Sequence, residues 1–144
     1  YGRWGLNYIY GTWSVLCALN AAGISKDDPA VRKAVAWLAS IQNTDGGWGE
    51  DGASYKLDYK GYEAAPSTAS QTAWSLLALM AAGAVDHPAV AKGVAWLMQT
   101  QNAAGEWDET LLKSTALQAA LDEVVSAAHS RPPPASQEHE EDRR

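Results

Sequence analysis

The chain carries one spaced pattern twice, Lys-x3-Trp-Leu-x3-Gln-x3-Gly-x-Trp. Every residue of the first copy recurs 59 positions later, as Trp37 does at Trp96. A pattern with a fixed period of this length indicates similar units that stack, because each unit needs its neighbour to bury a shared apolar face. The pattern therefore predicts a repeat architecture. The two copies are Lys33, Trp37, Leu38, Gln42, Gly46, Trp48 and Lys92, Trp96, Leu97, Gln101, Gly105, Trp107.

Each copy belongs to a predicted helix-turn-helix unit. An apolar stretch rich in Ala and Leu precedes each copy and ends at Gly23 or Gly83, which suits a left-handed C-terminal cap. We expect a buried inner helix there. After Pro29 or Pro88 an amphipathic outer helix follows, over roughly residues 28 to 42 in the first unit. Paired inner and outer helices around a centre predict an all-α fold, a partial α/α toroid, in which these units form an arc of an α6/α6 barrel.

The stretch between the units, from Gly49 to Ala65, mixes charged residues with Tyr55, Tyr59 and Tyr62. It is too polar for a core element. It predicts a long loop whose base is packed by tyrosines.

Composition excludes several classes of function. The 144 residues are 47% apolar, enough for one domain-sized core, yet no run approaches the roughly 18 to 20 apolar residues of a membrane span. The net charge of −6 argues against a nucleic-acid surface.

Cys17, the single cysteine, lacks Cys or His partners at metal-ligand spacing, so we expect a small buried hydrophobe and no metal site. The start, without Met or leader, suggests a chain that begins inside a unit.

The Gln and Trp of each copy are expected to act as a structural clasp. A Gln amide at the end of an outer helix can bond backbone groups of a neighbouring helix, while Gly46 or Gly105 lets the chain reverse so that Trp48 or Trp107 folds back. Sugar binding by the aromatic rings is the alternative, although the helical context and the lysines would be superfluous to it.

The repeats resemble the Gln-Trp motif of squalene-hopene cyclases and oxidosqualene cyclases. Residues 2 to 13, Gly-Arg-Trp-Gly-Leu-Asn-Tyr-Ile-Tyr-Gly-Thr-Trp, are similar to a stretch that follows an earlier such motif in those enzymes. Residues 66 to 74, Pro-Ser-Thr-Ala-Ser-Gln-Thr-Ala-Trp, are similar to the beginning of the family's next inner helix. The resemblance covers about residues 1 to 109 and is nearest to the bacterial squalene-hopene type.

The resemblance implies an isomerase of triterpenoid (hopanoid) biosynthesis, a type II cyclase that folds squalene in an apolar cavity. An aspartic acid protonates a terminal double bond, and rings close through carbocations to hopene or hopanol. Such chemistry needs aromatic faces that stabilise cations, and no metal or organic cofactor. By position, Trp4 matches a cavity indole, and Tyr10 matches a tyrosine that orders proton return to the acid. The alternative is that both are core aromatics of an inner helix.

The chain also departs from that family. It contains no Asp-x-Asp-Asp sequence, which holds the initiating acid, and no Phe. After Glu109 the family's cavity-closing segment is replaced by a predicted helix over residues 110–129 and a Pro-rich, acidic tail over 130–144, expected to be disordered. We therefore expect a fragment, from a truncated or frameshifted gene, that lacks the N-terminal part of the toroid and is inactive alone. A divergent natural end remains the alternative.

Two further interpretations remain. The arc could be a scaffold or a module that binds an apolar ligand or a protein without catalysis. The other is a prenyltransferase β-subunit toroid, which would require a zinc site of Asp, Cys and His. The resemblance implies a parent enzyme attached peripherally to the cytoplasmic side of a membrane. The isolated fragment is expected to be cytoplasmic or aggregated, because an opened ring exposes apolar helix faces.

Overall fold

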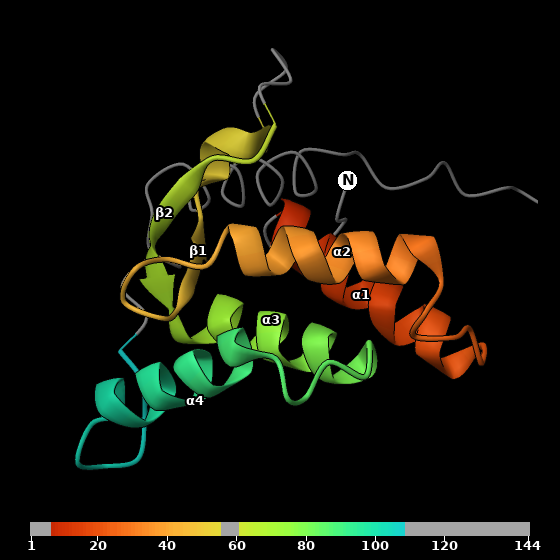
Figure 1. The fold of residues 1–144 in the computed structure, drawn as a ribbon. Helices are drawn as coiled ribbons and strands as arrows, with labels where there is room; N and C mark the ends of the chain where they lie inside the picture. The colour runs from red at the N-terminus through yellow and green to blue at the C-terminus, as the bar shows by residue number, and fades with distance from the viewer. Residues whose placement is uncertain (1–6, 56–60, 109–144) are drawn as a thin grey trace, which may run out of the picture. The chain divides into compact units, whose positions relative to one another are not determined.

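Two helix pairs, each an inner helix followed by an outer one, form the described part of the chain (Figure 1). The computed structural model describes residues 7–55 and 61–108, which belong to a unit spanning Tyr1–Leu111. The helices are α1 (Asn7–Ala21), α2 (Pro29–Ser40), α3 (Ala69–Ala81) and α4 (Pro88–Thr100). The architecture is all-α and agrees with the predicted helix-pair repeats of a toroid.

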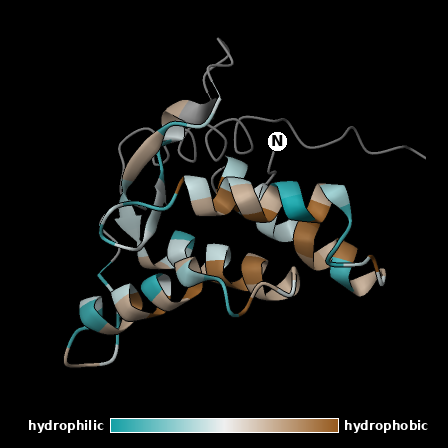
Figure 2. Ribbon diagram, in the orientation of Figure 1, coloured by the Kyte–Doolittle hydropathy of each residue, from teal (hydrophilic) through white to brown (hydrophobic). Residues whose placement is uncertain are grey.

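The inner helices α1 and α3 pack on each other and make the most extensive contact between any two helices. Ile9 and Leu16 of α1 and Leu79 of α3 are fully buried or nearly so, and Leu76 adds to the same core. Figure 2 shows hydrophobic segments along both helices. Because α1 and α3 share this core, the two repeats are joined through their inner helices.

Both inner helices end in the same hydrogen-bond arrangement. Ile24 N–H donates to the Leu19 carbonyl at 3.0 Å, and Ala84 N–H donates to the Leu79 carbonyl at 2.9 Å. Each bond spans the glycine that follows the helix and satisfies a carbonyl that the helix leaves open. The predicted helix ends at Gly23 and Gly83 are confirmed.

The outer helices begin alike and differ in how their apolar faces are covered. Asp28 accepts a hydrogen bond from Ala30 N–H at 2.8 Å at the start of α2, and His87 Nδ1 accepts one from Ala89 N–H at 3.2 Å at the start of α4. Val31 and Leu38 of α2 are buried. On α4, by contrast, Val94 is 44% exposed and Met98 73% exposed.

The segment expected to be a long loop contains a small antiparallel sheet. Strand β1 (Trp48–Glu50) pairs with β2 (Ala64–Thr68), with Trp48 opposite Thr68 and an irregularity before the next pair. A short 3-10 helix, Gly52–Tyr55, follows β1. The loop prediction was therefore wrong at both ends. The sheet forms because Gly47 and Gly49, on either side of Trp48, let β2 approach closely. A Cβ on Gly49 would lie 2.1 Å from the Pro66 carbonyl oxygen.

Within the described ranges, no helix is long and apolar enough to cross a membrane. The predicted helix over 110–129 and the predicted tail over 130–144 lie outside the described residues and stay predictions, as do the predictions made for Trp4, Tyr59 and the side chain of Tyr55.

Candidate functional site at the inner-helix N-termini

The first Gln-Trp clasp ties the end of α2 to the start of α4. Gln42 Nε2 donates to the Gly46 carbonyl at 2.7 Å and to the Ala89 carbonyl of α4 at 2.9 Å. Gly46 has a φ of 95°, the left-handed conformation that lets the chain reverse. The indole N–H of Trp48 then donates to the Leu38 carbonyl at 2.8 Å. We call Gln42, Gly46 and Trp48 the closed clasp.

Trp48 is fully buried and fits against a glycine of the next outer helix. A Cβ built on Gly93 of α4 would lie 2.6 Å from Trp48 Cζ3, closer than any real contact allows. The same junction has a second bond, because Trp96 Nε1 of α4 donates to Asp45 Oδ2 at 3.0 Å. Asp45 is a contact that the repeat pattern did not predict, since the second copy has Ala104 at the matching position.

The second clasp has the same internal bonds. Gln101 Nε2 donates to the Gly105 carbonyl at 2.8 Å, and Trp107 Nε1 donates to the Leu97 carbonyl at 2.9 Å. Trp107 remains 38% exposed, and no bond from Gln101 to another outer helix exists among the described residues. We call Gln101, Gly105 and Trp107 the open clasp.

The strand that follows the closed clasp places a buried carboxylate at the N-terminus of α1. Glu50 is 3% exposed. Its Oε2 accepts hydrogen bonds from Ile9 N–H at 2.9 Å and Tyr8 N–H at 3.0 Å, and Oε1 accepts from Tyr8 N–H at 3.0 Å. An anion is favourable there because the first N–H groups of a helix lack intrahelical partners and carry its positive dipole end.

The same strand is bonded to the start of α3. Glu50 N–H donates to Gln71 Oε1 at 2.7 Å, and Trp48 N–H donates to Thr72 Oγ1 at 3.0 Å. Both Gln71 and Thr72 are buried. The short sheet thus connects the N-terminal ends of both inner helices. Sequence reasoning missed Glu50, Gln71 and Thr72 because a strand pairing, rather than a local motif, brings them together.

Three aromatic rings gather near these N-terminal ends. Tyr10 lies edge-on to Trp13 at 5.3 Å and to Trp74 at 5.1 Å between ring centroids. Trp13 and Trp74 lie nearly parallel, at 6.2 Å and 11°. All three are half-buried. Among the described residues the Tyr10 ring contacts two indoles, and its hydroxyl has no hydrogen-bond partner.

Comparison with known proteins shows which protein family this chain resembles. The family described as "Squalene-hopene cyclase C-terminal domain" matches residues 1–121. The squalene-hopene cyclase of Bradyrhizobium diazoefficiens is 74% identical over 115 residues, which cover 80% of this chain and 17% of that protein. The chain belongs to the squalene-hopene cyclase family.

More distant relatives agree with this placement. The squalene-hopene cyclase of Zymomonas mobilis is 62% identical over 109 residues, 76% of this chain and 17% of that protein. The enzyme of that name from Alicyclobacillus acidocaldarius is 48% identical over 116 residues, 80% of this chain and 18% of that protein. The chain therefore spans less than a fifth of the length of these squalene-hopene cyclases. The family match also extends beyond residue 109, where the resemblance was expected to end.

Of the other residues in the squalene-hopene cyclase repeat, the lysines are exposed and Trp37 packs toward the inner helix α1. The lysines of the pattern, Lys33 and Lys92, are both exposed on the outer helices. Trp37 contacts Tyr62 edge-on at 5.8 Å and Tyr8 at 6.5 Å. In the described ranges, no group of three His, Cys, Asp or Glu residues gathers in a way that could hold a metal ion.

Tyr62 lies under the direct influence of the buried carboxylate. Its hydroxyl donates to the Gly49 carbonyl at 2.7 Å. Burial, and then the negative charge of Glu50, raise the pKa of Tyr62 from 10.0 to about 12. Both causes disfavour the phenolate, so Tyr62 stays neutral and keeps its hydrogen bond at neutral pH.

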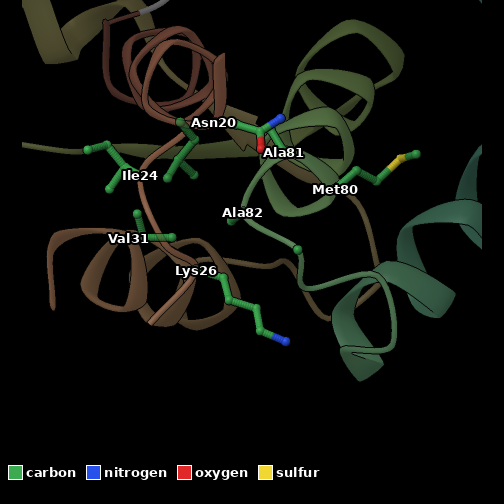
Figure 3. Close-up of a pocket in the computed structure, with 9 residues that line it drawn as sticks. Asn20, Ile24, Lys26, Val31, Met80, Ala81 and Ala82 are labelled. Carbon is green, nitrogen blue, oxygen red and sulfur yellow. The ribbon is translucent and has the colours of Figure 1, made fainter. Parts of the chain in front are cut away.

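A hollow of about 250 Å³ lies at the opposite end of the inner helices. It is formed by the C-terminal ends of α1 and α3 and the start of α2, with Leu16, Val31 and Ala82 among its lining residues. In Figure 3 the Lys26 side chain extends away from the labelled apolar groups, and Met80 extends to one side. The ten residues from Tyr10 to Asn20 correspond to about 15 Å of helix, so this hollow is separate from the aromatic cluster.

Proposed function

We propose that this chain forms one arc of the helical toroid of a squalene-hopene cyclase and contributes Tyr10, together with Trp4, to the cavity in which squalene is cyclised. The observation that carries the proposal is the state of Tyr10. Its ring contacts two indoles, and its hydroxyl has no partner among the described residues. A hydroxyl without a partner among the described residues supports a role in bonding a group supplied by another part of a complete enzyme.

The chemistry requires a strong acid that this chain does not provide. No Asp-x-Asp-Asp sequence occurs in its 144 residues. In the proposed reaction an aspartic acid protonates a terminal double bond of squalene, the rings close through carbocations, and a final proton loss gives hopene. Tyr10 would order hydrogen bonds at that acid, and Trp4, which lies outside the described residues, would offer a cation-stabilising face. The chain alone is therefore proposed to be inactive.

The proposed partners follow from these roles, in which the acid comes from another part of the enzyme. The arc needs the rest of the toroid, squalene as substrate, and no metal or organic cofactor. For the complete cyclase we propose peripheral attachment to the cytoplasmic side of a membrane. Val94 and Met98 of α4 and Trp107 in the turn after it are exposed apolar side chains, which supports the need for a covering element.

Two assays test the proposal. The 144-residue chain, incubated with squalene, should give no hopene; product formation would overturn the claim that the acid is missing. In the second assay, the matching segment of this chain replaces that of the Bradyrhizobium diazoefficiens enzyme. This chimera should form hopene, and Tyr10→Phe should lower its kcat by about 100-fold or more.

Tyr8→Phe is the control for that loss, because Tyr8 lies on the same helix and contacts Trp37 rather than the Tyr10 cluster. A folded chimera that fails to cyclise squalene would contradict the proposal, as would a Tyr10→Phe chimera with unchanged kcat.

The exposed apolar edge also supports a second proposal, in which the arc is a scaffold or binding module without catalysis. Val94, Met98 and Trp107 would then contact a protein or an apolar ligand. The chimera separates the two proposals, since a pure binding module would not restore cyclisation.

A further inference from the structure

The Tyr10 ring lies between side chains of two different inner helices. Trp13 is three residues further along α1, whereas Trp74 belongs to α3. Tyr10 meets Trp13 at an interplanar angle of 73° and Trp74 at 82°. These are the edge-to-face arrangements that aromatic quadrupoles favour.

The two indoles also support each other. Their rings are only 11° from parallel. Because Trp13 and Trp74 are stacked, neither ring can rotate without breaking that contact, and a change of the Tyr10 rotamer would break its edge-to-face contacts with both. The Tyr10 hydroxyl has no hydrogen bond among the described residues, so these ring contacts are what orient it.

We propose that Trp74 is a positioning residue for Tyr10, which it holds, together with Trp13, in the orientation that proton return requires. The inference rests on the proposed function of Tyr10. Trp74 is the decisive member because residues three apart on one helix are neighbours in any case, whereas the contact with Trp74 exists only when α1 and α3 are correctly packed. Catalytic groups displaced by about 1 Å can lose about 100-fold in rate, so a contact of this kind affects turnover.

The chain provides a matched control in another aromatic cluster. Trp37 contacts Tyr8 of the same helix α1, at 6.5 Å and a tilted angle of 49°, and contacts Tyr62. No contact between Trp37 and Tyr10 occurs among the described rings. Loss of Trp37 should therefore disturb packing near α1 without moving Tyr10.

The first test measures the orientation of Tyr10 in the 144-residue chain. Its six tyrosines are labelled with ¹³C, and the Tyr10 signals are assigned by their loss in Tyr10→Phe. Trp74→Leu should remove the Trp74 contribution to the ring-current shift of the Tyr10 ring signals, leaving that of Trp13, and should speed the ring flips of Tyr10. Trp37→Leu should change neither. Trp74→Phe keeps a smaller ring and serves as the second variant if Trp74→Leu does not fold. It should change the Tyr10 shift and ring-flip rate in part. Unchanged Tyr10 signals in both Trp74 variants would overturn the inference.

The second test measures turnover in the chimera. Trp74→Leu should lower kcat by about tenfold or more while KM stays within about twofold, because the substrate contacts remain. In a Tyr10→Phe background, Trp74→Leu should have no further effect on kcat, since its influence passes through Tyr10. Independent, multiplying effects of the two substitutions would overturn the inference. An inactive wild-type chimera would instead contradict the proposed function. The Tyr10 signals of the first test would then decide the inference.

Discussion

In the first repeat the Gln42 amide reaches Ala89 of the next outer helix, whereas in the second repeat the Gln101 amide bonds only Gly105 of its own turn among the described residues. The turns themselves are alike. Both glycines have positive φ, 95° for Gly46 and 82° for Gly105, and both indoles donate to a leucine carbonyl of the outer helix that precedes them. Each clasp therefore forms locally, and the contact with a neighbouring helix is added to a turn that already exists.

The difference between the clasps lies in burial. Trp48 is 0% exposed and Trp107 is 38% exposed. Hydrophobic stabilisation scales with the apolar area removed from water, so the closed clasp stabilises the fold much more than the open one does. The same sequence motif thus contributes differently to stability at its two positions, because among the described residues a following outer helix, α4, covers only the closed clasp.

The largest effect that this comparison predicts concerns the two tryptophans. Trp48→Ala should lower the free energy of unfolding by about 3 to 5 kcal/mol, because it empties a fully buried site. Trp107→Ala should cost less than about 2 kcal/mol, since the ring is partly in water already. Urea unfolding followed by fluorescence measures both. Equal losses would show that the closed and open clasps do not differ in energetic weight.

The second prediction concerns the glycine that receives Trp48. Gly93→Ala should destabilise by about 1 to 2 kcal/mol, because collision of its methyl with Trp48 and Leu76 outweighs the higher helix propensity of Ala. The matching position of the first repeat is Ala34, which packs against the core, and Ala34→Gly should also destabilise, by about 1 kcal/mol or more, through helix propensity and the lost methyl. Thermal unfolding measures both changes. A gain in stability for Gly93→Ala would show that the fit between Trp48 and Gly93 is not close enough to exclude a methyl group.

The third prediction isolates the bond between repeats. Gln42→Ala removes the bonds to both Gly46 and Ala89, whereas Gln101→Ala removes only the bond to Gly105. The first substitution should therefore cost about 1 kcal/mol more than the second. Hydrogen exchange gives an independent measurement, because only Gln42→Ala should raise exchange at the start of α4. The same increase in Gln101→Ala would contradict the assignment.

The sequence predicted those parts of the fold that depend on local patterns. The helix ends at Gly23 and Gly83 and the proline starts of the outer helices follow from neighbours in the chain, and the period of 59 residues follows from comparing the sequence with itself. The closed clasp was also predictable in kind, because a Gln at a helix end faces open backbone groups. Its partner, Ala89, was not named, since the pattern does not say which carbonyl of the next helix lies within reach.

The contacts made by Glu50 and Trp74 could not be predicted in the same way. Glu50 lies 41 residues from Ile9, whose N–H it accepts, and the pairing depends on the unexpected strand β1. The Trp74 ring meets Tyr10 only because α1 and α3 pack side by side. Long-range contacts of this kind follow from the three-dimensional packing of the repeats. Local propensity carries no information about them, and the candidate site is composed largely of such contacts.

The smallest expected effect tests the surroundings of the buried carboxylate in the strand after the closed clasp. Tyr62 has a pKa of about 12 in the folded chain, against 10.0 for an ordinary tyrosine, through burial and the charge of Glu50. Because the folded value is the higher one, the stabilisation is fully present below pH 10 and is lost as pH rises from 10 to about 12. Water screens a half-buried ring, so the loss should stay below about 1 kcal/mol.

Unfolding of the chain at pH 9 and at pH 11 measures this loss, and Tyr62→Phe should show less of it than the wild type. Glu50→Gln should reduce the loss only in part, since burial is the larger cause and remains. If Tyr62→Phe lost as much stability as the wild type over this range, the alkaline sensitivity would belong to other groups. Ionisation of Tyr62 would then not contribute measurably to the loss, and the folded chain would not raise its pKa as far as about 12.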